Sequence, residues 1–336
     1  MKAYEVQQFG IDQLALVERE DPRPAKGEVV VKFHAASLNY RDLMVVEGTY
    51  NPRMKVPAVP LSDGAGEVTD VGDGVTKWKV GDRVMPNFAQ HWLDGPATEE
   101  KRRSSLGAGA YWDGVLREFG VFGDEGLVRI PEHLSYEEAS TLPCAALTAW
   151  HALAISGQLK AGETVLTLGT GGVSIFALQI ARLFGARVIS TTGNEAKESK
   201  LKELGADVVI NYTTREDWDA AVLEATDKKG VDHIVEVGGS GTLARSLNAV
   251  RFGGHVAMIG ALTASGSFDP IKLFMKSARL QGVFVGSRSM FEQMNRAIEV
   301  AKMRPVVDRV FGFDEARDAM HYMKSGSHFG KVVIRY

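Results

Sequence analysis

A glycine-rich turn between an apolar run and a helical pattern is the feature that most constrains how this chain can fold. Residues 165–168 are apolar or β-branched, Gly169 and Gly171 take the first and third positions of the turn, and residues 175–181 place apolar side chains at helical spacing. The first glycine permits the sharp turn, the second lets a pyrophosphate approach the backbone, and the helix N-terminus attracts the anion. Ser174 stands where the usual pattern has its third glycine and is still small. The segment predicts a strand, a phosphate-binding turn and a helix that together hold a dinucleotide.

The residues after this turn continue the alternation of strand and helix. Strand patterns occur at 187–191, 208–210, 232–237 and 255–259, and a helical pattern at 197–204 ends at Gly205. Such alternation predicts an α/β fold with a doubly wound parallel sheet, whose ligand crevice lies beyond the carboxyl ends of the strands. The alternative is an α/β core in which the glycines serve only as turns.

The N-terminal part has a different pattern, which indicates mostly β structure. Residues 28–35, 67–72 and 82–85 read as strands, and prolines interrupt the segments between them. The polar, glycine-rich stretch 87–113 is expected to be a loop, and its basic cluster Lys101 to Arg103 a solvated part of that loop. We expect this loop and the loop at 262–275 to shape the substrate pocket.

Composition excludes several classes of protein. A chain of 336 residues with 45% apolar and 24% charged residues is ordinary for a soluble globular protein of about two domains. A net charge of -3 gives no electrostatic reason to expect nucleic acid or an anionic membrane as a partner. The most apolar window, 165–181, is interrupted by glycines and is no membrane span. The single cysteine, Cys144, excludes an internal disulfide framework and is typical of a cytoplasmic protein.

Five segments together resemble one enzyme family. The segments are Leu38 to Asp42, Gly64 to Val68, Trp78 to Val84, Ala139 to Trp150 and Phe329 to Ile334. They are similar to the medium-chain dehydrogenase/reductase superfamily, in particular to its zinc-independent branch of quinone-oxidoreductase-like and alcohol-dehydrogenase-like proteins. The resemblance implies a GroES-like, mostly β catalytic domain over 1–127 and 288–336, and a Rossmann domain over 128–287. It also implies a homodimer in which Leu280 to Val285 pair as edge strands across a two-fold axis.

Zinc-dependent members of that family hold a catalytic metal with two cysteines and a histidine, beside a glutamate. The matching positions in this sequence are Asn39 and Cys144 for the cysteines, Ser62 for the histidine and Asp63 for the glutamate. An amide and a hydroxyl are poor substitutes for a thiolate and an imidazole. We therefore expect no metal, and we interpret Cys144 as a packing residue rather than a reactive thiol.

Without a metal, other groups must stabilise the charge that develops on the substrate. The resemblance places Asn39, Tyr40 and Tyr50 near the nicotinamide, and Tyr50 lies where zinc-free enoyl thioester reductases keep a proton-donating tyrosine. A phenol or an amide can donate a hydrogen bond to an enolate or phenolate oxygen. The alternative is that Tyr50 only caps a loop and Tyr40 packs beneath it.

The resemblance also implies which residues contact the cofactor. NADP(H) is favoured over NAD(H) for two reasons. The second strand ends in Thr192, Gly193 and Asn194, where NAD enzymes keep a carboxylate that would repel a 2′-phosphate. Lys197 and Tyr212 match the residues that hold the 2′-phosphate in relatives. Glu195 is close by in the sequence, and its carboxylate would disfavour a 2′-phosphate. The remaining expected contacts are Thr148, Gly169, Thr170, Gly171, Gly172, Val173, Val237, Gly238, Ile259, Gly260, Val285, Gly286 and Lys331.

The sequence therefore predicts a zinc-independent oxidoreductase that passes a hydride from NAD(P)H to a small carbonyl-type acceptor such as a quinone, an enone or an aldehyde. Alcohol oxidation and enoyl thioester reduction are the alternatives among enzymes. A non-catalytic nucleotide-binding protein is the alternative from another class, because some relatives serve as lens crystallins.

Overall fold

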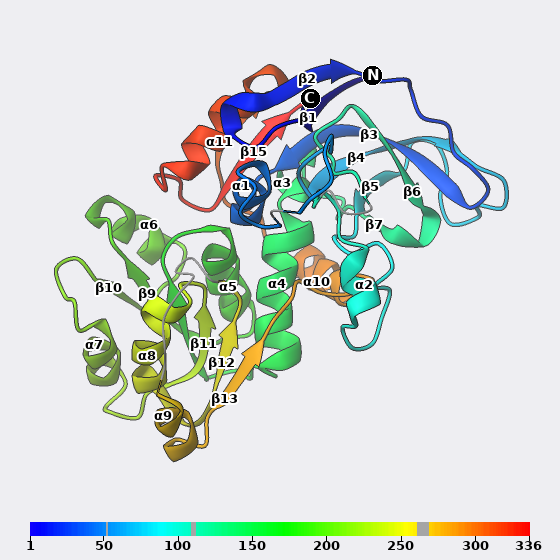
Figure 1. Cartoon of the computed structure of the whole chain (residues 1–336). Coiled ribbons are helices and arrows are strands. Elements are labelled where there is room, and N and C mark those ends of the chain that lie inside the picture. Colours follow the sequence, from blue (N-terminus) through cyan, green and yellow to red (C-terminus); the bar gives the residue numbers. More distant parts are fainter. Residues whose placement is uncertain (52, 109–111, 261–268) are drawn as a thin grey trace. The chain divides into compact units, whose positions relative to one another are not determined.

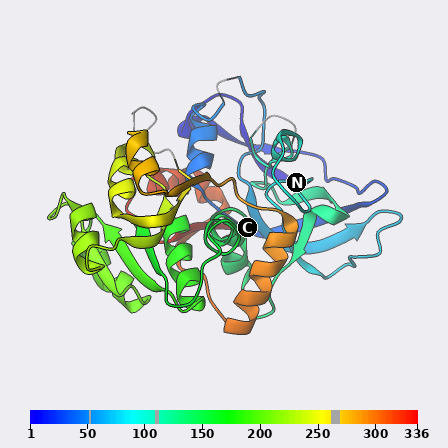
Figure 2. The same cartoon turned by 90° about the horizontal axis from the view of Figure 1, so that it is seen from below.

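The structure of the chain is a computed structural model that describes residues 1–51, 53–108, 112–260 and 269–336. It divides into two compact units, shown from two directions in Figures 1 and 2. Unit 1 comprises Met1–Leu147 and Gly286–Tyr336, and unit 2 comprises Thr148–Val285. The first division therefore falls after residue 147 rather than at the expected 127, because the intervening helix α3 (Tyr136–Ser140) packs against two strands of unit 1, β3 and β4.

Unit 1 is built on a seven-stranded sheet and a separate hairpin. The sheet runs in the order β14-β15-β3-β4-β5-β7, β6 also pairs with β3, and β1 pairs with β2. The strands are β1 (Lys2–Val6), β2 (Leu14–Glu18), β3 (Glu28–Ser37), β4 (Asp63–Val71), β5 (Arg83–Pro86), β6 (Phe119–Gly123), β7 (Leu127–Arg129), β14 (Val307–Gly312) and β15 (Lys331–Arg335). The three strands predicted in this part are confirmed as β3, β4 and β5.

The helices of unit 1 are short, apart from α10. They are α1 (Tyr40–Val46), α2 (Glu99–Arg103), α3, α10 (Arg288–Ala301) and α11 (Ala316–Lys324). On α10 the apolar residues recur at helical spacing, and Phe291, Met294 and Ile298 are fully buried, as that spacing predicts. The expectation of an irregular loop over the basic cluster was wrong for Glu99–Arg103, because Thr98 caps a helical turn there and Glu99 pairs with Arg103 at 2.6 Å.

The pairing of β15 with β3 brings the end of the chain beside its first third. The two strands are antiparallel, with Val333 opposite Ser37 and Ile334 opposite Ala36. Two residues beyond Ser37 the chain reaches Asn39, which caps α1. The first residue of β15, Lys331, thereby comes next to Asn39.

Unit 2 holds the predicted parallel sheet, at the lower left of Figure 1. Its six strands run in the order β10-β9-β8-β11-β12-β13 and all pair in parallel. They are β8 (Thr164–Leu168), β9 (Arg187–Thr192), β10 (Val208–Asn211), β11 (Val231–Glu236), β12 (Val250–Met258) and β13 (Arg279–Gly282). In chain order this is 3-2-1-4-5-6, the Rossmann order, so a ligand crevice is expected where β8 and β11 meet.

Helices connect these strands. They are α5 (Gly172–Leu183), α6 (Glu198–Glu203), α7 (Trp218–Ala225), α8 (Ser240–Ala249) and α9 (Pro270–Met275), and α4 (Leu147–Trp150) precedes the first strand. Strand β13 ends at Gly282, three residues before the expected end of the edge strand. The extended backbone has stopped by Val285, whose φ of 32° belongs to the left-handed region.

Candidate functional site

The glycine turn of unit 2 has the geometry of a phosphate-binding loop. Gly169 has a φ of 73°, which few other residues tolerate, and Gly171 caps α5 in an ordinary extended conformation. A Cβ atom added at Gly171 would meet no protein atom within 4 Å. Since neither backbone strain nor protein packing explains this glycine, the open space above it fits a ligand that approaches the backbone. Ser174 Oγ, in the first turn of α5, donates to the Leu168 carbonyl at 2.6 Å and so holds the beginning of α5 against the end of β8.

The residues predicted to hold a 2′-phosphate lie together at the end of β9. The Tyr212 amide donates to the Thr192 carbonyl at 2.9 Å, and a Cβ atom on Gly193 would lie 2.5 Å from the Tyr212 hydroxyl. Gly193 therefore makes room for the Tyr212 ring. Asn194 bends the chain, because its amide donates to Thr192 Oγ1 at 3.1 Å and its side chain accepts from the Ala196 amide. Lys197 ends the short turn that follows.

A buried carboxylate that the sequence analysis missed organises the ends of β11 and β12. Glu236 is fully buried, and its Oε1 accepts from the amides of Gly238 and Gly239 at 2.8 and 3.1 Å. Thr242 and Ser246 also donate to it from α8. An acidic residue at the end of an apolar strand could have signalled this role.

The expected cofactor contacts around this carboxylate lie close to one another. The Ile259 amide donates to the Glu236 carbonyl at 2.9 Å, and a Cβ atom at Gly260 would lie 2.0 Å from the Val237 carbonyl oxygen. Val237, Gly238, Ile259 and Gly260 thus meet where the Rossmann order expects a ligand.

The remaining expected contacts lie at the borders of the two units. Thr148 is buried in α4, and the Val285 carbonyl accepts from His151 Nδ1 at 2.7 Å. Burial lowers the pKa of His151, so the ring is neutral at pH 7. Gly286 packs on Leu147 within unit 1, where a Cβ atom would lie 2.8 Å from Leu147 Cγ. Contact of these residues with the cofactor stays a prediction.

In unit 1, Asn39 and Lys331 form the centre of a buried polar cluster. Lys331 is 3% exposed, and its Nζ donates to the Leu38 carbonyl at 2.5 Å and to Asn39 Oδ1 at 2.7 Å. Asn39 is also buried, and its Nδ2 interacts with the Asp63 carboxylate without a hydrogen bond of good geometry. Because an ammonium only donates, the amide must turn its oxygen toward Lys331 and its NH₂ group away. Lys331, expected to contact the cofactor, therefore also fixes the orientation of Asn39.

Asp63 is the carboxylate of this cluster. It is fully buried, it accepts from Ser62 Oγ at 2.6 Å and from the Cys144 amide at 3.0 Å, and Lys331 interacts with it electrostatically. Burial raises the pKa of Asp63 and lowers the pKa of Lys331, and each charge partly offsets the shift of the other. Cys144 lies in a π-helical stretch, Leu142–Ala146, of the kind often found at functional sites.

The two tyrosines differ in their surroundings. Tyr40, the first residue of α1, is 51% exposed. Tyr50 is 38% exposed, and the guanidinium carbon of Arg41 lies 5.1 Å from the centre of its ring. Arg41 was not among the predicted site residues, although it belongs to the same short segment as Asn39. Parts of the two expected pocket loops, residues 109–111 and 262–268, lie outside the described residues. The expectation of a loop was wrong for the end of the second segment, because Asp269 caps the helix α9 there.

Comparison with known proteins identifies the family. Residues 25–132 match the model of the alcohol dehydrogenase GroES-like domain, and residues 172–301 match the model named zinc-binding dehydrogenase. A zinc-type alcohol dehydrogenase-like protein of Schizosaccharomyces pombe is 42% identical over 97% of this chain and 96% of its own length. The chain belongs to the medium-chain dehydrogenase/reductase superfamily. It is an oxidoreductase of that superfamily, as the resemblance implied.

Other relatives of this oxidoreductase carry different names. An acryloyl-coenzyme A reductase of Metallosphaera sedula is 32% identical, covering 94% of this chain and 95% of its own, and a human quinone oxidoreductase is 28% identical, covering 99% and 97%. The crystal structure of a putative alcohol dehydrogenase from Sinorhizobium meliloti is 38% identical, with a TM-score of 0.93 over 100% of this chain and 98% of that one. The predicted combination of a GroES-like domain and a Rossmann domain is confirmed.

The described side chains at the family's metal position do not fit a catalytic zinc ion. Asn39 Oδ1 already accepts from an ammonium, and the Ser62 hydroxyl donates to Asp63. Burial, together with Asp63, raises the pKa of the Cys144 thiol far above its usual range, so the sulfur keeps its proton. Zinc needs a thiolate or an imidazole, and a fixed cation beside the site would repel it. In the described part of the chain, no three His, Cys, Asp or Glu side chains are grouped to hold a metal.

Proposed function

We propose that this oxidoreductase reduces a quinone, an enone or an aldehyde with NAD(P)H and without zinc. The observation that carries the proposal is the buried Asn39 side chain, whose Oδ1 is held by Lys331. Its Nδ2 interacts with Asp63 but makes no hydrogen bond of good geometry there. A donor that is matched this weakly can turn to an oxygen acceptor that a ligand supplies.

The chain's own residues would meet the charge that reduction creates. The bound nicotinamide supplies the hydride, and negative charge then appears on the oxygen of the acceptor. Asn39 Nδ2 is a donor whose direction is fixed before the reaction, and the nearby ammonium of Lys331 adds a favourable field. Tyr50 can donate a second hydrogen bond or a proton from the same unit.

The test is NADPH oxidation with a panel of quinones, enones and aldehydes, run with wild type and Asn39→Ala. We expect at least one acceptor to be reduced, and Asn39→Ala to lower its turnover by a factor of about 100 with cofactor affinity unchanged. The same panel includes alcohols with NADP⁺. If no acceptor in the panel is reduced, or if Asn39→Ala reduces the best acceptor as fast as wild type, the proposal is wrong.

Enoyl thioesters are a second candidate class of acceptor. A relative 32% identical to this chain is named acryloyl-coenzyme A reductase. Acryloyl-CoA belongs in the panel for that reason, and a preference for it of tenfold or more over every free enone would favour this class.

We also propose a preference for NADPH over NADH. Gly193 makes room for the Tyr212 hydroxyl at the end of β9, and the residues from Thr192 to Asn194 contain no carboxylate that would repel a 2′-phosphate. Lys197 follows one turn later and would supply a cation. Catalytic efficiency should be at least tenfold higher with NADPH, and Lys197→Ala should weaken NADPH alone. Equal efficiency with NADH that Lys197→Ala leaves unchanged would contradict this preference.

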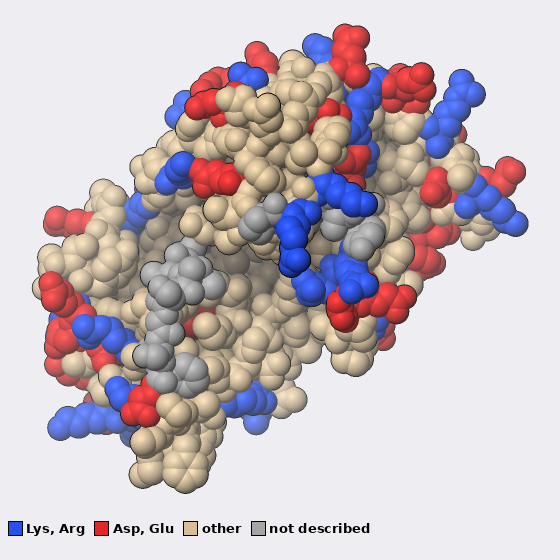
Figure 3. All heavy atoms as spheres, viewed as in Figure 1, with Lys and Arg blue, Asp and Glu red and all other residues tan. Residues whose placement is uncertain are grey.

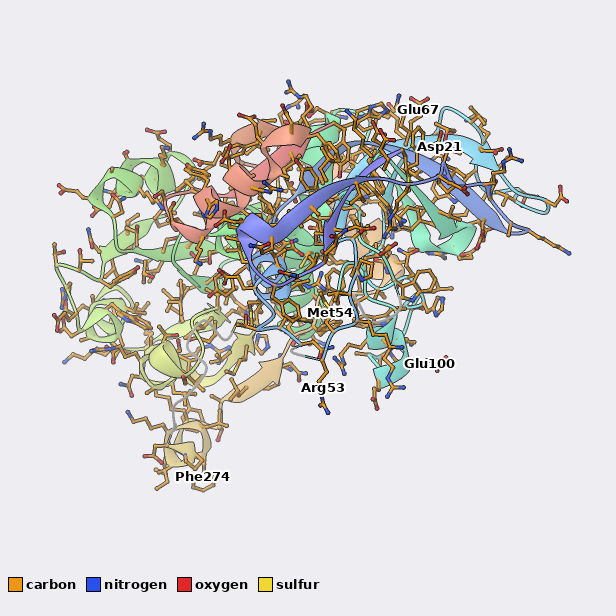
Figure 4. All side chains as sticks on the ribbon, turned by 45° about the horizontal axis from the view of Figure 1, so that its top comes forward. Asp21, Arg53, Met54, Glu67, Glu100 and Phe274 are labelled. Atoms are coloured by element: carbon orange, nitrogen blue, oxygen red, sulfur yellow. The ribbon has the colours of Figure 1, made fainter. Side chains whose placement is uncertain are left out.

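The exposed edge of unit 2 supports a homodimer. Strand β13 ends the sheet, and Ile271, Phe274 and Met275 on the neighbouring α9 are 63%, 76% and 63% exposed. Figure 4 shows Phe274 at the outer end of this unit, and in Figure 3 the surface there, at the bottom of the view, is mostly uncharged. An open strand edge beside exposed apolar side chains suits pairing with a second copy.

A further inference from the structure

Arg41 is a buried cation with unused hydrogen-bonding capacity. Its side chain is only 11% exposed. Nη1 donates to the Leu106 carbonyl at 3.0 Å and lies 3.5 Å from Asp42 Oδ1. The other two nitrogens, Nε and Nη2, are shielded from solvent and have no hydrogen-bond partner among the described residues. Buried donors of a charged group are rarely left unmatched, because the desolvation they suffer is not recovered.

The carboxylate of Asp42, beside Arg41, does not satisfy all the hydrogen-bond donors of the guanidinium group. Asp42 Oδ2 already accepts from the Asn39 backbone amide at 2.8 Å, and only Oδ1 faces the arginine, at a long distance. Burial raises the pKa of Asp42 to about 6, so its carboxylate is mostly ionised at pH 7, but it reaches only Nη1 of Arg41 and leaves Nε and Nη2 unmatched. The other close neighbours are aromatic, with ring centres of Tyr50 and Phe88 at 5.1 and 4.9 Å from the guanidinium carbon. These rings stabilise the positive charge, but they do not accept the N–H hydrogen bonds that lie in the plane of the guanidinium group.

The two unmatched nitrogens are the pair that binds a carboxylate. In a guanidinium group, the N–H bonds of Nε and Nη2 point in parallel from one edge and match the two oxygens of a carboxylate. Arg41 lies two residues from Asn39, at the beginning of the same helix α1. Asp42 contacts both residues, because its Oδ2 accepts from the Asn39 backbone amide and its Oδ1 faces Arg41 Nη1, so Asn39 and Arg41 belong to one polar cluster.

We propose that the Nε and Nη2 edge of Arg41 binds a carboxylate of the acceptor, so that this enzyme reduces carbonyl-conjugated or aldehyde compounds that also carry an acid group. The inference rests on the proposed function and narrows its substrate class. Because Nε and Nη2 are shielded from solvent, binding requires the packing around this edge to open. A carboxylate there supplies the two acceptors that Asp42 does not.

The experiment compares an acid with its uncharged ester. 4-Carboxybenzaldehyde and methyl 4-formylbenzoate differ only in the charged group, as do trans-4-oxopent-2-enoic acid and its methyl ester. We expect wild type to favour each acid by at least tenfold in kcat/KM. Arg41→Met should abolish that preference by raising KM for the acid, with less than a twofold change for the ester. Arg41→Lys keeps the positive charge but lacks the two parallel N–H groups, so it should lose most of the preference for the acid over the ester. This second variant keeps the test valid if Arg41→Met does not fold.

The control is Arg102→Met, which removes an exposed arginine of α2 and should leave the preference intact. Binding of benzoate and of phenylphosphonate, measured by calorimetry without turnover, gives an independent readout. Benzoate binding that is lost in Arg41→Met supports the site even if no acceptor in the panel is reduced. Equal use of acid and ester by wild type, or binding of phenylphosphonate but not benzoate, overturns the inference while the proposed reduction stands.

Discussion

Lys331 makes two hydrogen bonds from a position that is almost fully buried. Its Nζ holds Asn39 Oδ1 and the Leu38 carbonyl, and its charge offsets part of the burial penalty of Asp63. The positive charge of this cluster therefore belongs to the chain itself.

Replacing Lys331 by Met should therefore affect both stability and turnover. Two charge-assisted hydrogen bonds disappear and Asp63 loses its nearest cation, so the free energy of unfolding should fall by about 3 kcal/mol. Turnover should fall at least tenfold at temperatures where the variant is fully folded, because Asn39 can then rotate. Lys324→Met is the control, since it removes only an exposed pair with Glu47 and should change stability by less than about 1 kcal/mol. Normal turnover in folded Lys331→Met would contradict the positioning role.

Tyr50 can be tested without disturbing its packing. Tyr50→Phe deletes the hydroxyl and keeps the ring that lies 5.1 Å from Arg41. If the hydroxyl donates to the developing oxyanion, turnover should fall at least tenfold, because one such donor is typically worth a factor of about 100 or more. The affinity for cofactor should not change. A variant that matches wild type on its best acceptor would make Tyr50 a packing residue, and Tyr40→Phe would be the next variant to measure.

At the scale of elements, the turn from β8 to α5 and the ends of β11 and β12 use glycine for different reasons. Gly171 is open on its Cβ side and has an ordinary φ, whereas Gly260 faces the Val237 carbonyl at a distance that no Cβ atom could occupy. We propose that the first glycine leaves space for a ligand, whereas the second allows the close packing of two strand ends.

The pair Gly171→Ala and Gly260→Ala separates these roles. Gly171→Ala should leave the free energy of unfolding within about 1 kcal/mol of wild type. It should weaken cofactor binding at least tenfold, because the added methyl group occupies the approach to the backbone. Gly260→Ala should lower the free energy of unfolding by about 1–3 kcal/mol, because the backbone must shift. Fluorescence titration with NADPH and urea unfolding measure the two quantities, and unchanged cofactor affinity in Gly171→Ala would contradict the binding role.

Strands β11 and β12 carry two buried histidines opposite each other. His233 pairs in register with His255, their Nδ1 atoms are 3.5 Å apart, and His233 Nε2 lies 2.9 Å from Glu163. Burial, with Arg279 and His233 nearby, lowers the pKa of His255 to about 3. The unfolded chain binds a proton at this histidine near pH 6.5, but the folded chain does so only near pH 3.

The stability of the protein should therefore fall on acidification. The contribution of the neutral His255 ring to the free energy of unfolding is fully present above about pH 6.5. It is lost as the pH falls toward 3, with a slope of up to about 1.4 kcal/mol per pH unit. Urea unfolding between pH 7 and pH 4 should show this slope, and His255→Gln should reduce it. His321→Gln, at an exposed histidine beside Asp12, is the control and should leave the slope as in wild type. If wild type and His255→Gln show the same slope, His255 is not the cause of the pH dependence of stability.

At the scale of the whole molecule, the chain leaves unit 1 once and returns to it. Strands β14 and β15, after the return, complete the sheet that β3 and β4 began. Among the described residues, no helix is long and apolar enough to cross a membrane. Three exposed apolar side chains gather on α9, the helix that precedes the edge strand β13.

Disrupting this edge should dissociate the proposed homodimer. Phe274→Glu places a charge on a side chain that is 76% exposed, so it should not affect folding of the monomer. Sedimentation velocity at micromolar concentration should give a dimer for wild type and a monomer for the variant. Val300→Glu is the matched control, because Val300 is 87% exposed and belongs to unit 1, whereas the proposed interface is formed by residues of unit 2. A monomeric wild type would contradict the proposal.

The sequence determined the elements whose patterns are local. The glycine turn and the strand patterns after it are set by backbone conformation and by the period of apolar residues, so the parallel sheet of unit 2 could be predicted. The family motifs at 38–42 and 329–334 identified unit 1, although a short helix at Glu99–Arg103 and the early end of β13 were missed. A single cap and a single left-handed residue decide such boundaries.

Only the tertiary structure decided which side chains meet. Lys331 and Asn39 are 292 residues apart and come together because β15 pairs with β3. Arg41 appears in the sequence as one charged residue on a short helix, and only the surrounding rings and the shielding of Nε and Nη2 reveal an unmatched cation. Local patterns fix backbone conformation, but the partner of a buried polar group depends on segments that the chain brings back from a distance, and that information is not local.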